Sequence, residues 1–376
     1  MMMASLSAFS PIYETIRGEA VESTHFGAVA VVDAGGRLVA SHGDPGAITF
    51  LRSTAKPLQA ISFIEQGGQE RFDLDLREVA LICASHAGTD EHVTVVKSIQ
   101  SKAGVTEADL LCGTHPLSHR PTLQAMRQRA EEITPNRHNC SGKHSGMLAF
   151  AIMLGQPKEN YIDIQHPVQQ RILRTFAEMC CLPPEQVAVG IDGCSAPNFA
   201  APLYNAALAL ARLCDPGTGN VAPQRRANAC QTITRAMTSY PEMIGGPNSF
   251  DTHLMQVVGG RLISKGGAEG YLGLGLLPGG IEPGSPALGI ALKISDGDLK
   301  GHNPPSSESP GTVRPAVALE ILRQLGALSE AELNALAAYG PKVALQNWRR
   351  IIVGEGRPCF QLNWGVINQQ TSAASA

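Results

Sequence analysis

The sequence predicts a protein of the α/β class, of the α+β type, with an antiparallel sheet built from both ends of the chain and a mainly helical middle. Apolar runs typical of strands lie near both ends, whereas helical spacing dominates residues 89–245. Glycines and Pro-Gly turns become frequent after residue 259, which is typical of hairpins. This order does not match regular βαβ units. We therefore expect a mixed sheet domain of residues 1–80 and 255–376 and a mainly helical domain of residues 81–254.

The expected strands are short apolar runs that end at turn residues. Residues 26–32 and 37–41 flank the turn sequence Asp-Ala-Gly-Gly at residues 33–36. An apolar run at residues 79–84 fits either a buried strand or a turn of helix, because periodicity cannot separate the two over so short a length. The Gly-rich part of the chain adds three expected strands, at residues 261–264, 271–277 and 287–294.

Helical spacing marks most of the remaining chain. Apolar residues recur every three to four positions across residues 58–65, and Gly67 ends that pattern. Ser329 opens a capping-box pattern at the start of a late helix. Residues 302–312, rich in Pro and Ser, are expected to form a solvated loop or linker. The other expected helices cover residues 121–132, 144–154, 168–179, 199–213, 228–240, 315–325 and 329–338.

Composition excludes several classes of function. The 376 residues carry a formal net charge of −3 without a Lys/Arg-rich run, so we expect no nucleic-acid partner. No apolar run approaches the ~18 residues of a membrane helix, so we expect no membrane partner. The first ten residues lack the pattern of a signal peptide. Nine cysteines with no C-x-x-C spacing argue against a disulfide framework, so we expect a cytoplasmic protein.

The first chemical motif is Ser53-Thr54-Ala55-Lys56, just before the first expected helix. Residues three apart share one face of a helical turn, so the Ser53 hydroxyl can meet the Lys56 amine. A lysine can act as the base of a serine nucleophile when its pKa falls by about 3 units from ~10.4. Pro57 fits only the first turn of a helix, which places Ser53 at the helix start. The alternative is a capping residue followed by a surface lysine.

Two polar segments follow apolar ones and could line a site. Ser85 lies in Cys-Ala-Ser-His at residues 83–86, where the alternative is a helix cap by Ser85 or Thr89. Residues 138–146 are the densest polar segment, and His138, Cys140 and His144 within it are possible metal ligands. No C-x-x-C or H-E-x-x-H frame is present, so a tight turn that crosses the core stays open as the alternative.

Two tight turns complete the candidate site. Asp192 stands between glycines after an apolar run, either as a functional carboxylate or as an ordinary Asx turn. Cys194 could join Cys140 on one metal ion, or it could be a small core residue. Lys265, followed by two glycines, can lie on a strand edge beside a substrate. The alternative for Lys265 is an ordinary hairpin turn.

Taken together, these segments resemble the class 3 (rhizobial-type) L-asparaginase family, also called the asparaginase II family. The resemblance spans roughly residues 10–360 and implies a fold similar to that of penicillin-recognising proteins and serine β-lactamases. The S-x-N and K-[ST]-G patterns of those more distant proteins are absent, which argues against β-lactam chemistry. The motifs that carry the resemblance are R-S-x-x-K-P at residues 52–57, C-A-S-H at 83–86, H-N-C-S-G-K-H at 138–144 and G-x-D-G-C at 190–194.

The resemblance also implies roles for ten residues, a zinc cofactor and a homodimer. The implied catalytic groups are two Ser–Lys tandems, Ser53–Lys56 and Ser85–Lys265. The implied ligands of zinc, completed by water, are Cys140, Lys143 and Cys194. The implied substrate contacts are Arg52, His144 and Asp192. Of these last three, Asp192 is expected to hold the α-ammonium group of the substrate and Arg52 its α-carboxylate.

The sequence therefore predicts an L-asparaginase, which hydrolyses the side-chain amide of L-asparagine to L-aspartate and ammonia. Ser53 is the expected nucleophile and Lys56 its base, while Ser85 and Lys265 relay protons. One alternative is another serine amidohydrolase, acting on β-lactams or peptides. The second alternative is a non-catalytic, zinc-stabilised binding protein whose serines only cap helices.

Overall fold

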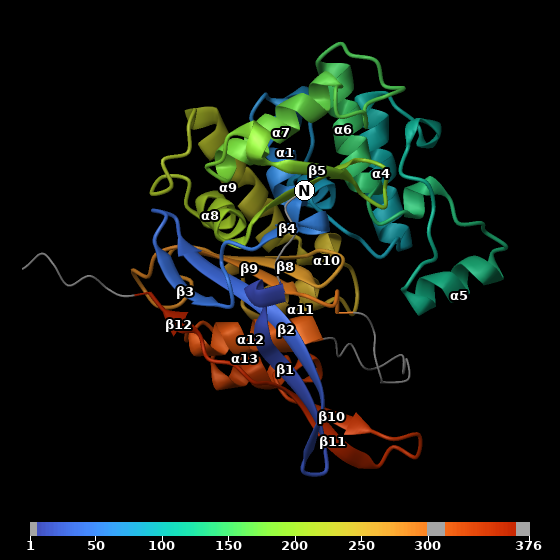
Figure 1. The fold of residues 1–376 in the computed structure, drawn as a ribbon. Helices are drawn as coiled ribbons and strands as arrows, with labels where there is room; N and C mark the ends of the chain where they lie inside the picture. The colour runs from blue at the N-terminus through green and yellow to red at the C-terminus, as the bar shows by residue number, and fades with distance from the viewer. Residues whose placement is uncertain (1–5, 299–312, 366–376) are drawn as a thin grey trace, which may run out of the picture.

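The computed structural model describes residues 6–298 and 313–365. The expected loop at residues 302–312 lies outside these described residues. A large sheet runs through the molecule, and helices cover both of its faces (Figure 1). Among the helices of the described residues, none combines the length and the hydropathy of a membrane span.

The large sheet takes its strands from both ends of the chain, as predicted. Its strand order is β10-β11-β1-β2-β9-β8-β7, and β3 pairs with both β2 and β12. Each of these pairs is antiparallel, so the predicted mixed α/β class with an antiparallel sheet is confirmed. The strands are β1 (Ser10–Arg17), β2 (Ala20–Asp33), β3 (Leu38–His42), β7 (Leu262–Gly266), β8 (Tyr271–Leu276), β9 (Leu288–Ile294), β10 (Val343–Gln346), β11 (Ile352–Pro358) and β12 (Asn363–Trp364).

The centre of the sheet is buried on both faces. Residues 27–32 of β2 are all buried, without the alternation of a half-exposed strand. The reason is that α8 (Leu203–Cys214) packs against β2, β8 and β9, while α12 (Val313–Gln324) contacts β8 and β9 on the opposite side (Figure 1). Gly289 permits the close approach of α8, since a Cβ atom there would lie 1.8 Å from the Ala207 carbonyl oxygen.

Most of the other helices come from the middle of the chain. The ambiguous run at residues 79–84 lies largely in helix α3, which begins with a capping box between Asp75 and Glu78. Thr89 caps the next helix, α4, and Ser329 caps α13, as its sequence pattern predicted. These helices are α1 (Lys56–Ile64), α2 (Gly68–Arg71), α3 (Leu76–Ile82), α4 (Asp90–Ala103), α5 (Arg120–Gln128), α6 (Ser141–Met153), α7 (Pro167–Met179), α9 (Gln224–Ser239), α10 (Pro241–Ile244), α11 (Phe250–Val257) and α13 (Glu330–Ala335).

The single helix predicted for residues 199–213 is wrong. The structure divides this segment into strand β6 (Pro197–Pro202) and helix α8. Pro202 explains the division, because the residue before a proline favours extended backbone and proline itself fits only the start of a helix. Strand β6 pairs with β4 (Ile48–Phe50) and β5 (Ala188–Ile191) in a second, three-stranded sheet.

The small sheet and helix α1 place residues from before position 80 in contact with the helices and strands of residues 81–254. Helix α1 packs against α6, α7 and α9, although it precedes residue 80 in the chain. The predicted division into two domains at residues 80 and 254 stays a prediction. Five elements now converge: the start of α1, the ends of α3 and β5, the start of α6, and strand β7.

Candidate active site

Ser85 lies in the loop that follows helix α3, and its backbone is fixed on both sides. The Ser85 N–H donates to the Ile244 carbonyl (2.9 Å), and the His86 N–H donates to the Asn139 carbonyl (3.2 Å). His86, buried, also contacts the Ser141 hydroxyl through Nε2 at 3.0 Å. These contacts tie the Ser85 loop to the start of α6.

Two buried lysines meet at the Ser85 hydroxyl. Lys56 Nζ and Lys265 Nζ each donate to Ser85 Oγ at 2.9 Å. The side chains of both lysines are buried. Lys56 also donates to the carbonyls of Ala84 (2.5 Å) and Asn139 (3.5 Å), whereas Lys265 donates to the carbonyl of Gly266 at 2.6 Å. The structure thus brings the predicted pair Ser85–Lys265 together and adds Lys56 to it.

Ser53 lies nearby in the chain but outside this cluster of hydrogen bonds. It belongs to a short 3-10 helix, Arg52–Ala55, that leads directly into α1. Within the described part of the chain, its hydroxyl makes no hydrogen bond, and its side chain is partly exposed. The neighbouring Thr54 hydroxyl donates to the Lys265 carbonyl at 2.8 Å, which links this segment to β7. Arg52 has a φ of 52°, a backbone strain of about 1–3 kcal/mol for a non-glycine residue.

The electrostatics of Lys265 suit a proton acceptor. Burial, the largest effect, lowers the pKa of Lys265 to about 7, and the charges of Lys56 and Arg314 lower it further. The carboxylate of Asp251 opposes this shift. A lysine with such a pKa exists partly as the neutral amine at neutral pH, and the neutral amine can accept a proton from a hydroxyl at 2.9 Å.

The two predicted substrate clamps contact each other. Arg52 Nε donates to Asp192 Oδ1 at 2.7 Å, and Arg52 also lies 3.7 Å from the carboxylate of Glu269. Asp192 sits on a tight turn that is closed by hydrogen bonds with Ser195 and Ala196, as its sequence context indicated. Burial alone would raise the pKa of Asp192, but the charges of Lys143 and Arg52 hold it below its ordinary value. Asp192 is therefore ionised and paired.

The three predicted metal ligands also lie together. Cys140, Lys143 and Cys194 are all buried, and Lys143 Nζ donates to Cys194 Sγ at 3.0 Å. A hydrogen bond from Cys194 lowers the pKa of Cys140 well below that of an ordinary thiol. Burial opposes the charge of Lys143, but the neighbouring Cys194 and Cys140 raise its pKa overall. Two buried thiols thus share one buried lysine.

His144 stands next to this cluster with one nitrogen unused. Its Nδ1 contacts the Tyr161 hydroxyl at 2.6 Å, while its buried Nε2 lies beside Cys194 and has no hydrogen-bond partner among the residues that the structure describes. Burial lowers the pKa of His144 to about 4, so the imidazole is neutral. Across residues 6–298 and 313–365, no group of three or more His, Cys, Asp or Glu side chains is arranged to hold a metal ion.

Sequence reasoning missed several residues that support these groups. Asn139 and Ala84 act through backbone carbonyls, Tyr161 orients His144, and Asp251 holds the strand that carries Lys265. Backbone acceptors carry no signal in the side-chain sequence. Tyr161 and Asp251 lie outside the polar motifs, and only the tertiary contacts identify them.

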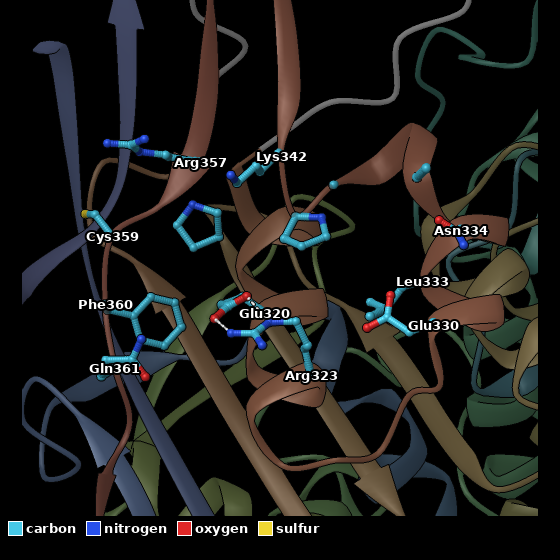
Figure 2. Close-up of a pocket in the computed structure, with 14 residues that line it drawn as sticks. Glu320, Arg323, Glu330, Leu333, Asn334, Lys342, Arg357, Cys359, Phe360 and Gln361 are labelled. Atoms are coloured by element: carbon cyan, nitrogen blue, oxygen red, sulfur yellow. Dashed lines mark hydrogen bonds and ion pairs between the residues drawn. The ribbon is translucent and has the colours of Figure 1, made fainter. Parts of the chain in front are cut away.

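A separate pocket of about 640 Å³ lies between helices α12 and α13 and the end of β11 (Figure 2). Its lining includes Glu320, Arg323, Lys342, Arg357 and Phe360. Arg323 and Glu320 are paired with each other, as Figure 2 shows. None of the ten predicted site residues lines this pocket, so it is distinct from the Ser–Lys cluster.

Comparisons with known proteins agree with the sequence motifs. The profile of the L-asparaginase II family matches residues 13–358. A comparison with curated proteins finds no match. Several solved glutaminase structures align with most of the chain at low sequence identity. They include a covalent complex of a Bacillus subtilis glutaminase with 5-oxo-L-norleucine (14% identity, 72% of this chain and 80% of that chain, TM-score 0.32), a probable Bacillus subtilis glutaminase complexed with 6-diazo-5-oxo-L-norleucine (13%, 79% and 84%, 0.35), and a Bacillus glutaminase in 4.3 M NaCl (14%, 80% and 90%, 0.33).

The family match covers nearly the whole described chain and includes all four motifs. It also includes every residue of the Ser–Lys cluster and of the thiol cluster. The chain therefore belongs to the asparaginase II family and is an amidohydrolase.

Proposed function

We propose that this amidohydrolase is an L-asparaginase, which releases ammonia from the side-chain amide of L-asparagine. The observation that carries the proposal is the Ser85 hydroxyl, held 2.9 Å from two buried lysine amines in a chain of this family. Amide hydrolysis requires a nucleophile and the delivery of a proton to the leaving nitrogen. The Lys56–Ser85–Lys265 cluster is suited to the second task.

In the proposed reaction, the Ser53 hydroxyl attacks the side-chain amide carbon, and its proton passes to the Lys56–Ser85–Lys265 cluster. The same cluster then protonates the amide nitrogen, the C–N bond breaks and ammonia leaves. Water cleaves the resulting ester and regenerates Ser53. Two features favour Ser53: among the described residues its hydroxyl has no hydrogen-bond partner to give up, and it lies at a helix start, where free N–H groups can stabilise an oxyanion.

Ser85 is the alternative nucleophile, and one observation favours it. Lys265, whose pKa is about 7, lies directly on the Ser85 hydroxyl. A slow-leaving asparagine analogue that acylates the enzyme separates the two cases by peptide mass. We expect the added mass on the peptide with Ser53, lost in Ser53→Ala and only slowed in Ser85→Ala. The label on Ser85 would reverse the assignment, and no label at all would favour direct attack by water.

The Arg52–Asp192 ion pair supports a free amino acid as the substrate. A zwitterion carries the complementary pair of charges side by side, so its α-carboxylate can replace Asp192 at Arg52 and its α-ammonium can replace Arg52 at Asp192. A peptide or a β-lactam lacks this pair of charges. The proposed pocket therefore selects the α-amino-acid end and presents the side-chain amide to the serines.

We also propose a zinc ion bound by Cys140, Lys143 and Cys194. Two thiols suit zinc, and the unused Nε2 of His144 beside them is a further group that a metal could satisfy. Bound zinc would supply a fixed positive charge close to the substrate clamps. A lysine amine binds metal only when neutral, so zinc affinity should fall steeply as the pH drops. Metal analysis at pH 7.5 after addition of excess zinc tests this, and a metal-free protein would contradict it.

A cytoplasmic homodimer completes the proposal. All nine cysteines are free, as a reducing compartment would keep them. Large apolar side chains lie exposed outside the core, among them Ile191, Trp348 and Trp364, and a second copy could cover some of these. Light scattering during size-exclusion chromatography tests the dimer, and a monomer at micromolar concentration would contradict it.

An ammonia-release assay tests the main proposal. The purified protein is offered L-asparagine, L-glutamine and a chromogenic β-lactam, in the parent and in Lys265→Met. We expect ammonia from L-asparagine with the parent, a loss in the variant, and no β-lactam hydrolysis. Hydrolysis of the β-lactam alone would favour another serine hydrolase. Tight zinc binding without any turnover would favour a binding protein.

A further inference from the structure

Asp251 stands in the first turn of helix α11, yet it does not cap that helix. The capping role belongs to Ser249, whose hydroxyl accepts from the Thr252 N–H. The two carboxylate oxygens of Asp251 point instead to strand β7. Oδ1 accepts from the Ser264 hydroxyl at 2.6 Å, and Oδ2 accepts from the Gly266 N–H at 2.9 Å.

These two hydrogen bonds bracket Lys265. Successive side chains of a strand point to opposite faces, so Ser264 and Lys265 project to opposite sides of β7. Asp251 therefore holds the residues before and after Lys265 while the lysine side chain extends away to Ser85. A shift of β7 would break both carboxylate bonds and would move the amine from the Ser85 hydroxyl.

The place of β7 in the sheet explains why such a clamp is needed. Among the strands that the structure describes, β7 is the last on its side of the sheet and pairs only with β8. The opposite edge of a terminal strand has N–H groups without a strand partner, and the Asp251 carboxylate takes one of them. Gly266 makes the approach possible, since a Cβ atom at that position would lie 3.0 Å from Oδ2.

We propose that Asp251 is a positioning residue, which fixes the amine of Lys265 against the Ser85 hydroxyl by clamping the strand on both sides of the lysine. The proposal rests on the proposed function only in assigning proton transfer to Lys265. The clamp itself stands on the two hydrogen bonds and the strand register. Asp251 makes no hydrogen bond with Ser53 or Ser85 within the described residues, so its effect passes through Lys265.

The charge of Asp251 gives the clamp a second effect that can be measured. Charged and titratable groups face Lys265 from several elements: Asp251 on α11, Lys56 on α1, Cys140 before α6, Arg314 on α12, and Cys83 after α3. Burial is the main reason that the pKa of Lys265 is low, and Asp251 is the largest opposing effect. Removal of its charge should lower that pKa further. The neutral amine would then persist to lower pH, and the acid limb of the activity profile would move down.

Asp251→Asn tests the clamp, with Ser249→Ala as its matched control on the same helix turn. An amide can still contact Ser264 and Gly266, but both hydrogen bonds lose the charge assistance of the carboxylate and become weaker. We expect Asp251→Asn to lower kcat by about 10-fold or more with little change in KM, since small misplacement of a reacting group is costly. We also expect its acid limb to shift down by about half a pH unit or more. Ser249→Ala removes the helix cap, so it should lower the melting temperature but keep the parental kcat and pH profile.

Lysine titration separates failure of the clamp from failure of the proposed function. The signal of Lys265 in a 13C-lysine NMR spectrum is assigned by its absence in Lys265→Met, and it titrates whether or not asparagine is a substrate. A lowered titration point in Asp251→Asn supports the clamp even if the parent releases no ammonia. If the parent is active, and Asp251→Asn shows both an unchanged Lys265 titration and the parental pH profile, the proposed role of Asp251 is wrong.

Ser264→Ala provides a second variant in case Asp251→Asn does not fold. It removes one of the two carboxylate bonds but keeps the charge and the bond to Gly266. We expect kcat to fall several-fold while the acid limb and the Lys265 titration stay at their parental values. A parental kcat in Ser264→Ala overturns the clamp. A shifted acid limb in Ser264→Ala would also overturn it, because no charge has been removed.

Discussion

The two predicted Ser–Lys pairs differ in how the chain brings their members together. Ser53 and Lys56 are three residues apart at the start of one helix, whereas Ser85 and Lys265 come from different elements, 180 residues apart. Local spacing favours a contact in the first pair. The structure instead places both amines on Ser85, each 2.9 Å from its hydroxyl. The spacing of the motif thus predicted that Lys56 lies at the start of a helix, but it did not predict which serine its amine contacts.

Lys56 contacts Ser85 because a buried ammonium group needs several hydrogen-bond acceptors. An ammonium has three N–H donors, and burial without acceptors for them costs several kcal/mol. The loop at Ala84, the loop at Asn139 and the Ser85 hydroxyl supply three acceptors for Lys56. Ser53 could supply only one. Lys265 has two acceptors and is the lysine whose pKa is lowered to about 7. Lys265 is therefore the lysine better suited to accept the proton of Ser85.

The largest expected effect comes from removing either amine. Lys56→Met and Lys265→Met keep a similar volume but lose the proton carrier, and each should lower kcat by ~10²–10⁴-fold. Steady-state ammonia release measures the effect, and circular dichroism excludes a loss of fold. Lys102→Met is the matched control, because it removes an ammonium that contacts Asp73 and Glu78 rather than a serine. More than ~10% residual activity in either active-site variant would remove that lysine from the mechanism.

A smaller effect is expected at the Arg52–Asp192 ion pair. Asp192→Asn removes the charge that would hold the α-ammonium group of the substrate and removes the closer of the two carboxylates that contact Arg52. A charge-assisted hydrogen bond contributes about 1.5–3 kcal/mol, so KM should rise by about 10- to 100-fold. Initial rates over a wide range of asparagine concentration measure this change. Glu269→Gln, at the exposed and more distant contact of Arg52 (3.7 Å), is the control and should change KM little. A parental KM in Asp192→Asn would place substrate recognition elsewhere.

Sequence reasoning predicted the fold better at the centre of the sheet than at its margins. The buried runs in β2, β8 and β9 could be predicted because helices cover both faces there and nearly every residue of each run is apolar. Strands β1 and β10 to β12 were not predicted, because they are half-exposed and mixed in composition. The prediction for residues 199–213 was wrong for a different reason: a short buried strand leads directly into an apolar helix, so the two resemble one helical segment.

At the site, the motifs predicted which residues lie together but not how they pair. Cys140, Lys143 and Cys194 are clustered as the motifs implied. The mutual ion pair of Arg52 and Asp192 was not predicted, because each was considered only toward a ligand. Contacts through backbone carbonyls, such as Lys56 to Asn139, depend on the tertiary path of the chain, which residue types alone do not encode.

The pH profile of activity should report the titration of Lys265. The pKa of Lys265 in the folded protein is about 7, below that of a free lysine, and its acceptor form is the neutral amine. Activity should therefore be constant well above pH 7 and fall by about 10-fold for each pH unit below it. Rates at saturating asparagine from pH 5 to 9 measure this limb, with stability checked at each pH. A profile that is flat down to pH 5 would show that Lys265 does not accept the proton.

The smallest effect concerns the link between the two pairs. The Thr54 hydroxyl donates to the Lys265 carbonyl at 2.8 Å, so the segment that carries Ser53 is tied to the strand that carries Lys265. Thr54→Val keeps the shape but leaves a buried carbonyl without this donor, which should cost about 1–3 kcal/mol of unfolding free energy. If the link also aligns the two serines, kcat should fall several-fold. Thr54→Ser keeps the hydroxyl and should recover kcat even where the lost methyl group lowers stability. Denaturant unfolding and initial rates on the three proteins separate the two effects. Equal losses of kcat in Thr54→Val and Thr54→Ser would mean that packing, and not the hydroxyl, couples the local pair to the distant one.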